Sequence, residues 1–428
     1  MKRIHLSQGC ALTIIPSDKF KTEYFDFNLI LPLREETASY AALLPAVLRR
    51  GCEKYPTMAS LTKHLDYLYS TGFSTRVLKR GENQILGFTM DFLRDALVPD
   101  GKSLGEDVFA ALHAVLFEPL LENGAFKGEY VESEKKNQID AIRSLINNKN
   151  AYAMKKCHEA MCRGSYFAVS ENGTEKGVSA ITGKALYDFY KKLFKTAQIE
   201  LYYVGTAAEE KVVSWSKTLL CGVEREPKEL IPTAVFKRER TDVNELCEEM
   251  EVAQGKLILG FSSGHSLKDP DYTVYNLFNE LYGGSPTSKL FDNVREKMSL
   301  CYYCRSIPEA HKGILTVASG IEVENRDRAV SEILHQLELT KQGNISDEEL
   351  LAAKKSLVNS YRQLYDDNAG MALWYLSRRI AGSERTLEDV IEEIGRVTKE
   401  QVARCAADTV LDTIFFLKGT LKNGGNEE

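Results

Sequence analysis

The chain has 428 residues, of which 43% are hydrophobic and 27% are charged, as in an ordinary globular protein. Its net charge of −6 gives no long-range attraction to nucleic acid or to anionic lipid, so we expect neither as a partner. The length is sufficient for two or three domains with separate cores.

The N-terminal segment 1–18 lacks the apolar core of a signal peptide, and no run approaches the roughly 18 apolar residues of a membrane span. We therefore expect a cytoplasmic protein with no membrane span. The nine cysteines are odd in number and scattered, which favours reduced thiols over a disulfide framework. They are Cys10, Cys52, Cys157, Cys162, Cys221, Cys247, Cys301, Cys304 and Cys405.

The first half of the chain alternates strand-like and helical patterns. Alternating apolar residues predict a strand over 85–92, and an amphipathic pattern predicts a helix over 107–121. A long helix is expected to include 134–145. Segment 181–206 then predicts a helix followed by a strand that ends in Gly-Thr.

The second half repeats this order with a period of about 215 residues. A strand over 313–321, a helix over 327–339, a long helix over 353–364 and a helix–strand pair over 397–420 follow in turn. A period this long indicates a duplicated domain rather than a solenoid. The order of elements predicts an α+β fold, with helices packed on a mostly antiparallel sheet in each half.

The domain boundaries are placed from composition. Residues 221–246 contain Pro227, Pro232 and a charged run, and are interpreted as the connector between an N-terminal domain, 1–220, and a C-terminal domain, 247–421. The polar end of the chain, 422–428, is expected to be disordered.

Three segments carry a resemblance to a known family. They are Gly-Cys-Glu-Lys-Tyr-Pro at 51–56, Gln-Gly-Lys-Leu-Ile-Leu-Gly at 254–260, and 271–306, which contains Gly-Gly, Ser-x-Leu-Phe and Arg-Glu-Lys. Together they resemble insulinase/pitrilysin-like zinc peptidases, including half-length bacterial members and the subunits of mitochondrial processing peptidase. The resemblance covers nearly the whole chain. It implies two homologous domains that form half of a clamshell chamber, so that the chain would need a partner.

The metal motif of the family is absent. Active members carry His-x-x-Glu-His on the helix before Gly-x-Glu-Lys-Tyr-Pro, with a further glutamate on a later helix. The corresponding positions are Ala42, Pro45, Ala46 and Ala141, which offer no side-chain ligand atom. The seven histidines are nowhere closer than 24 positions, so no helix can present two of them four residues apart. We therefore expect no metal in this chain, and zinc in a partner subunit.

Two further positions match the family. Its second domain has an arginine, and a tyrosine seven residues later, that contact substrate and the reaction's oxyanion; here these are Arg295 and Tyr302. Arg295 is predicted on a helix that begins at Ser285, and Tyr302 on the following strand. The alternative is a surface ion pair for Arg295 and core packing for Tyr302.

The glycines before this helix leave two interpretations open. Gly283 and Gly284 could form a loop near the mouth of the chamber, or a plain turn between helices, which is the preferred interpretation.

Three other signals are interpreted as structural. Cys301 and Cys304 have redox spacing, but a strand would place them on opposite faces. The cluster of Cys157, His158 and Cys162 is small for a zinc site. A stripe of aromatic residues at helical spacing is expected to pack in the core; it consists of Tyr187, Phe189, Tyr190 and Phe194.

The leading hypothesis is a non-catalytic subunit of a heteromeric zinc peptidase. It would pair with a homologous subunit that has the intact zinc motif and bind a peptide or small-protein substrate. It would also contribute Arg295 and Tyr302 to the partner's site, in bacterial peptide processing or protein modification. The alternatives are an independent zinc peptidase with atypical ligands and a purely structural subunit of a larger complex.

Overall fold

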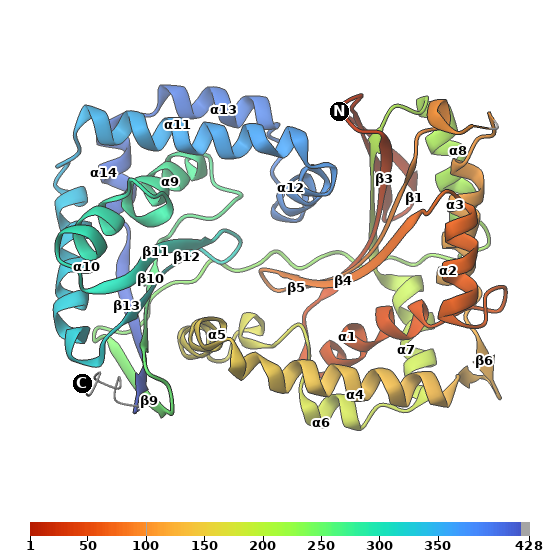
Figure 1. The fold of residues 1–428 in the computed structure, drawn as a ribbon, viewed down its shortest axis with the longest axis horizontal. Coiled ribbons are helices and arrows are strands. Elements are labelled where there is room, and N and C mark those ends of the chain that lie inside the picture. Colours follow the sequence, from red (N-terminus) through yellow and green to blue (C-terminus); the bar gives the residue numbers. More distant parts are fainter. Residues whose placement is uncertain (100, 421–428) are drawn as a thin grey trace, which may run out of the picture. The chain divides into compact units, whose positions relative to one another are not determined.

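The structure is a computed structural model that describes residues 1–99 and 101–420 (Figure 1). The predicted disordered tail, 422–428, lies outside the described residues. The chain divides into two compact units, each with its own large sheet. Unit 1 consists of Met1–Arg143, Val169–Pro232 and Asp366–Ser377; unit 2 consists of Ser144–Ala168, Thr233–Tyr365 and Arg378–Glu428.

Unit 1 contains a six-stranded sheet in the order β1-β2-β8-β3-β5-β4. All neighbouring strands are antiparallel except β2 and β8. The strands are β1 (Lys2–Ser7), β2 (Cys10–Pro16), β3 (Thr22–Pro32), β4 (Gly72–Arg80), β5 (Asn83–Leu93) and β8 (Gln198–Gly205). A separate two-stranded ribbon joins β6 (Leu121–Glu122) to β7 (Ala125–Phe126).

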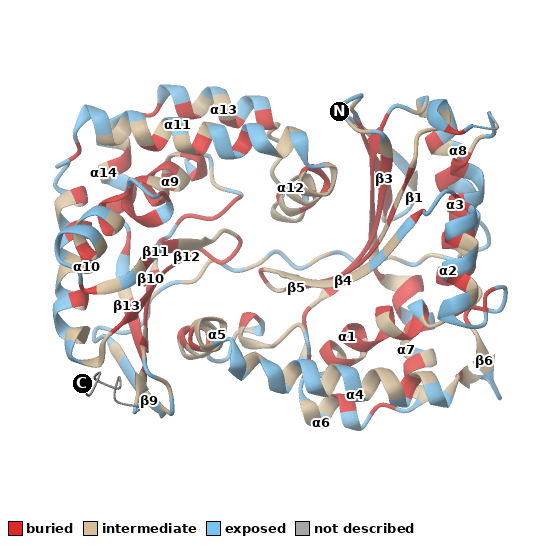
Figure 2. Ribbon diagram, viewed as in Figure 1, coloured by how far each residue is buried: buried red, intermediate tan, exposed pale blue. Residues whose placement is uncertain are grey.

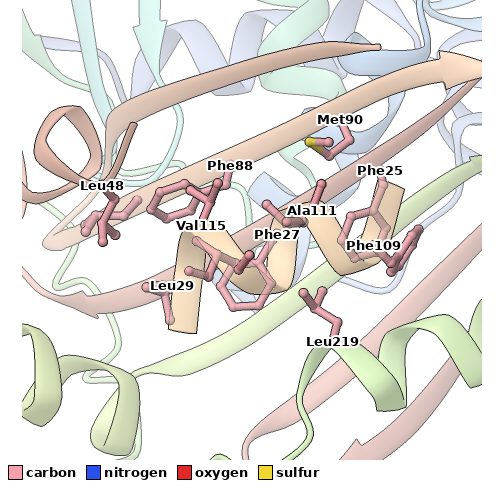
Figure 3. Packing of buried hydrophobic residues seen from close by; sticks show 14 of the residues in the cluster. Phe25, Phe27, Leu29, Leu48, Phe88, Met90, Phe109, Ala111, Val115 and Leu219 are labelled. Carbon is pink, nitrogen blue, oxygen red and sulfur yellow. The ribbon is translucent and has the colours of Figure 1, made fainter. Parts of the chain in front are cut away.

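Unit 1 also contains helices, and those that begin at Glu35, Gly105, Gly183 and Glu209 pack directly on the sheet. The helices of unit 1 are α1 (Glu35–Arg49), α2 (Met58–Tyr67), α3 (Gly105–Phe117), α4 (Gly128–Ser144), α6 (Glu175–Ser179), α7 (Gly183–Thr196) and α8 (Glu209–Leu219). Alternate residues of β3 supply the buried side chains Phe25, Phe27 and Leu29, which meet α3 (Figure 3). The rings of Phe25 and Phe109 lie 4.3 Å apart. Each such burial stabilises the fold by about 1.5–3 kcal/mol.

Unit 2 contains a five-stranded sheet in the order β11-β12-β10-β13-β9. Its strands are β9 (Asn244–Met250), β10 (Gly255–Ser262), β11 (Cys301–Glu309), β12 (Ile314–Ile321) and β13 (Val410–Gly419). Read from its parallel end, the order β9-β13-β10-β12-β11 reproduces β2-β8-β3-β5-β4 of unit 1, with the parallel pair in the same place. This shared topology confirms the predicted pair of homologous α+β domains.

The second half of the chain supplies unit 2 with helices that begin with or without a side-chain cap. They are α9 (Tyr272–Asn279), α10 (Arg326–Lys341), α11 (Asp347–Gln363), α13 (Leu387–Arg396) and α14 (Lys399–Ala407). The side chains of Ser346, Thr386 and Thr398 each accept a hydrogen bond from the backbone three residues on, and each forms a reciprocal capping box. Helix α12 (Asn368–Ala381) is divided, since its residues up to Ser377 group with unit 1.

None of the helices in the described part of the chain is long and apolar enough to cross a membrane.

The inner strands β10 and β12 of the second sheet are buried on both faces (Figure 2). Helices α9, α10 and α14 cover one face, and α5 (Lys149–Met161) covers the other by packing on β10 and β13 (Figure 1). Helix α5 comes from the first half of the sequence, so the packing units are not continuous stretches of chain. A β-carbon added to Gly260 of β10 would lie 2.3 Å from Met161 Sδ and 3.0 Å from Cys157 Sγ. The missing side chain therefore allows α5 to approach the sheet closely.

We expect Gly260→Val to lower the free energy of unfolding by about 1–3 kcal/mol, because the added methyl groups overpack the contact with α5. Gly395→Ala in α13 is the control, since open space surrounds that position. Chemical denaturation of both variants would measure the difference. Equal stability of the two variants would contradict a close contact at Gly260.

Candidate functional site

The positions of the family's metal motif lie on two helices of unit 1. Ala42, Pro45 and Ala46 are on α1, where the first two are buried, and Ala141 is exposed on α4. Proline has no N–H to donate within the helix, and none of the four residues carries a donor atom on its side chain. These positions serve packing and cannot bind a metal ion through their side chains.

An ion pair joins the two helices instead. Arg50 follows the last residue of α1, and its Nε lies 2.6 Å from Glu134 Oε1 on α4. The Arg50 side chain is 26% exposed and that of Glu134 is 13% exposed, so the pair is largely shielded from water.

Arg295 lies in a π-helical segment, Phe291–Lys297, of unit 2. The predicted start of this helix at Ser285 is wrong, because Ser285–Ser288 form a turn and helical backbone begins at Lys289. The guanidinium of Arg295 lies 4.6 Å from the centre of the Phe291 ring, and its Nε is 3.6 Å from Glu296 Oε1. The side chain is 41% exposed and can donate hydrogen bonds to a bound molecule.

The Arg295 segment is anchored at its start. The Nζ of Lys289, a residue only 7% exposed, lies 2.7 Å from Glu349 Oε1 in the first turn of α11. Asn293 Nδ2 donates to the carbonyl of Lys289 at 2.8 Å and to Gln336 Oε1 at 3.2 Å. These contacts fix the backbone that carries Arg295 while its side chain remains accessible.

Tyr302 lies near the start of β11, which is an edge strand of its sheet. The residue is 55% exposed, and its hydroxyl donates to Glu322 Oε1 at 2.7 Å, so it does not pack in the core. Among the described residues no hydrogen bond joins Tyr302 to Arg295. Both side chains are on the surface of unit 2 and available to a ligand.

Gly283 fits closely against β11. A β-carbon at this position would lie 2.7 Å from Ser306 Oγ and 2.8 Å from Ser306 N, while Gly284 is exposed beside Asn279. Neither glycine has a positive φ. Gly283 therefore allows the π-helical segment Glu280–Gly284 to approach β11 closely.

The two thiols of Cys301 and Cys304 lie on the same side of β11. A β-bulge between Cys301 and Tyr303 shifts the alternation, so the prediction of opposite faces is wrong. The hydrogen bond with the Cys304 thiol lowers the pKa of Cys301, although burial acts in the opposite direction.

A cation-lined cavity of about 870 Å³ lies beside Tyr303 and Arg305 of β11. Its basic side chains are Lys149, Lys256 and Arg305, and no acidic residue lines it. In the part of the chain that the structure describes, none of the three cations forms an ion pair. Burial lowers the pKa of Lys256, which is the mark of an uncompensated positive charge.

Gly320 of β12 lies beside two residues that line this cavity, Lys256 and Tyr303. In the register of the sheet it lies opposite both Lys256 and Tyr303, and a β-carbon on it would be 2.6 Å from Tyr303 Cε1. The Tyr303 hydroxyl donates to Asn150 Oδ1 at 3.0 Å, which ties the strand to the start of α5. The cavity is therefore a shaped, positively charged recess next to an edge strand.

The remaining sequence signals are structural. The rings of Tyr190 and Phe194 are buried in the core of unit 1, with Tyr187 and Phe189 packed against it. Cys157 and Cys162 are buried in unit 2, and His158 Nε2 lies 2.8 Å from Thr316 Oγ1. The cation-lined cavity is not visible in the sequence, because its residues come from three separate segments.

Comparison with known proteins identifies the family. The family model for the peptidase M16 inactive domain matches residues 180–357. A relative named "Probable inactive metalloprotease YmfF" from Bacillus subtilis is 34% identical over 96% of each chain. Another from the same organism, "Uncharacterized zinc protease YmxG", is 22% identical over 81% of this chain and 85% of its own length.

Solved structures agree with this assignment. A conserved protein from Enterococcus faecalis is 28% identical, with a TM-score of 0.89 over 99% of both chains. A peptidase M16 inactive domain from Pseudomonas fluorescens is 16% identical, with a TM-score of 0.80 over 99% of both chains. The chain therefore belongs to the insulinase-like M16 peptidase family, as a member without the metal motif.

The anchor of the Arg295 segment can be tested with Glu349→Gln. Glutamine can still accept the Ser346 N–H of the capping box but leaves the buried Lys289 ammonium without a counter-ion. We expect unfolding free energy to fall by about 1–3 kcal/mol, measured by chemical denaturation. Glu348→Gln, at an exposed neighbouring position, should change it much less.

The effect of Glu349→Gln should depend on pH. Burial disfavours the Glu349 carboxylate, but hydrogen bonds from Lys289 and Ser346 outweigh this and lower its pKa below the ordinary 4.5. The stabilisation is thus present in full above pH 4.5 and is lost as the pH falls through the folded-state pKa. A stability difference from wild type that stays constant on acidification would contradict this account.

Proposed function

We propose that this chain is a non-catalytic, peptide-binding subunit of a heteromeric M16 peptidase, whose zinc is held by a homologous partner. One contrast carries the proposal. The four motif positions lack side-chain atoms that could bind a metal, whereas Arg295 and Tyr302 are exposed hydrogen-bond donors. The two Bacillus subtilis relatives, one named inactive and one named a zinc protease, support a pairing of this kind.

In this assembly Arg295 and Tyr302 would contact the substrate bound at the partner's zinc. A guanidinium and a phenol can both donate hydrogen bonds to a carbonyl oxygen as negative charge develops on it. Neither residue activates water by itself, so cleavage would require the partner's metal. The expected setting is the processing of peptides or the modification of small proteins in bacteria.

The proposal is tested by mixing this chain with the zinc-motif paralogue of the same genome. We expect little cleavage of a peptide library by either chain alone and strong cleavage by the mixture. Arg295→Ala should reduce the turnover of the mixture by about 10²-fold, the usual cost of removing one such donor. Tyr302→Phe, which removes only a hydroxyl, should act in the same direction.

Arg328→Ala is the matched control, since Arg328 is an exposed arginine on α10. Full activity of the paralogue alone would refute the proposal that this chain is a subunit required for cleavage. An active mixture that is indifferent to Arg295→Ala would instead favour a purely structural subunit. Cleavage by this chain alone would favour an independent peptidase.

The substrate is proposed to carry an acidic group. The outer edge of β11 can pair with an extended peptide, and the cation-lined cavity lies beside that edge. A peptide carboxylate placed there would meet Lys149, Lys256 and Arg305, which have no other counter-ion in the described chain.

We expect Arg305→Ala and Lys256→Ala each to weaken the binding of an acidic peptide by about two- to fivefold, since a partly exposed ion pair contributes up to about 1 kcal/mol. Fluorescence anisotropy would measure the dissociation constants. The same peptide with glutamate replaced by glutamine is the control, and both variants should bind it as wild type does. Equal losses for the two peptides would contradict recognition of charge.

A further inference from the structure

A cluster of potential metal ligands lies in unit 2, away from the features used above. Ligand atoms of His265, Asp271 and Cys405 all lie within 4.8 Å of one another. His265 follows β10, Asp271 precedes α9, and Cys405 lies in the last turn of α14, which packs on α9. His265 and Cys405 are buried, whereas Asp271 is open to solvent and could admit an ion.

One pair of donor atoms has the spacing of a tetrahedral site, and the third donor lies within 4.8 Å of both. His265 Nδ1 is 3.3 Å from Asp271 Oδ1, and donors bound to one zinc ion lie about 3.3–3.7 Å apart. On the other side of the ring, His265 Nε2 is 3.2 Å from Asp408 Oδ2. A carboxylate on the second nitrogen is the usual partner of a metal-binding histidine, because it fixes the orientation of the ring. Stacking on Tyr275 at 5.2 Å holds the ring as well.

One carboxylate of the cluster forgoes a hydrogen bond to its helix, and the other is placed unfavourably for the helix dipole. Asp271 is the N-cap residue of α9, yet its side chain accepts no capping hydrogen bond and is directed to His265. A capping bond is typically worth about 1 kcal/mol. Asp408 lies at the C-cap of α14, where the helix dipole disfavours negative charge. A cation at this point would compensate both placements.

The thiol completes the set. Cys405 is a free cysteine and is only 4% exposed. Its Sγ lies within 4.8 Å of the donor atoms of His265 and Asp271, and a zinc ion would bind it as the thiolate with release of the thiol proton. Nitrogen, oxygen and sulfur donors together suit Zn²⁺ better than Mg²⁺ or Ca²⁺, which take oxygen ligands.

We propose that His265, Asp271 and Cys405 form a zinc-binding site, oriented by Asp408, that ties the end of β10 to the start of α9 and the end of α14. The fourth position is taken by water. The site is separate from the motif positions on α1 and α4, and it replaces the expectation that this chain holds no metal. It does not depend on the proposed subunit function.

The test uses the full chain, stripped with chelator under reducing conditions and reconstituted with Zn²⁺ or Co²⁺. We expect one ion per chain, a rise in melting temperature, and a near-ultraviolet thiolate-to-cobalt band. Cys405→Ala should abolish the band and weaken binding by at least tenfold, and Asp408→Asn should weaken it by about 10–100-fold. Cys157→Ala, at another buried cysteine, should leave the cobalt band and the affinity for the metal unchanged.

Asp271→Asn tests the carboxylate alone, because asparagine has the same shape but is a poorer ligand, and Asp271 makes no capping hydrogen bond that the change could remove. We expect weaker zinc binding with the stability of the metal-free chain retained. The proposal is overturned if the wild-type chain binds no zinc. It is equally overturned if cobalt binds without the sulfur band, or if Asp271→Asn and Cys405→Ala bind as wild type does. Asp271 is exposed, so this variant should remain folded even where Cys405→Ala does not.

Discussion

The second sheet is apolar on both faces, and this requires a cover on each of them. Residues of β10 and β12 that point in opposite directions are equally buried, as in sheets enclosed between helical layers. The helices that follow these strands cover one face only. The other cover, α5, comes from the first half of the chain, with Ala153, Cys157 and Met161 facing Ile258 and Ala318. Unit 2 therefore cannot complete its core without this segment.

This dependence explains why α5 connects packing to the candidate site. Its close approach at Gly260 fixes the helix on the sheet, and its first residues then form one wall of the cation-lined cavity. The opposite wall is β11, which Gly283 and Ser306 hold against the helical turn before the Arg295 segment. The recess is thus a consequence of core packing, and its charge is supplied by three residues that contribute little to that packing.

Much of the fold could be predicted because its signals are local. The helix–strand pairs at 183–205 and 399–419 repeat because each copy contains the same short pattern, and the shared strand order follows from that duplication. Predictions failed where a single residue alters the backbone. A bulge beside Tyr303 reverses the expected direction of Cys301, and a turn replaces the first helical residues after Ser285. The packing of α5, from the first half of the chain, on the sheet of unit 2 could not be inferred. Periodicity indicates that a helix has an apolar face but not which sheet that face covers.

The candidate sites also divide into those with a local sequence signal and those that only folding assembles. The absence of a metal motif on α1 is visible in the sequence, because its ligands would be four residues apart. The pairing of His265 with Cys405 is not, because 140 positions separate them. Only folding makes them neighbours: α14 packs on α9, and this places a thiol near an aspartate that has no capping bond. Unit 2 thus carries an acidic locus at the end of α14 and a basic recess at the start of α5. Opposite charges of this kind within one fold can bind different partners, a cation at the first and a carboxylate at the second, without competition between them.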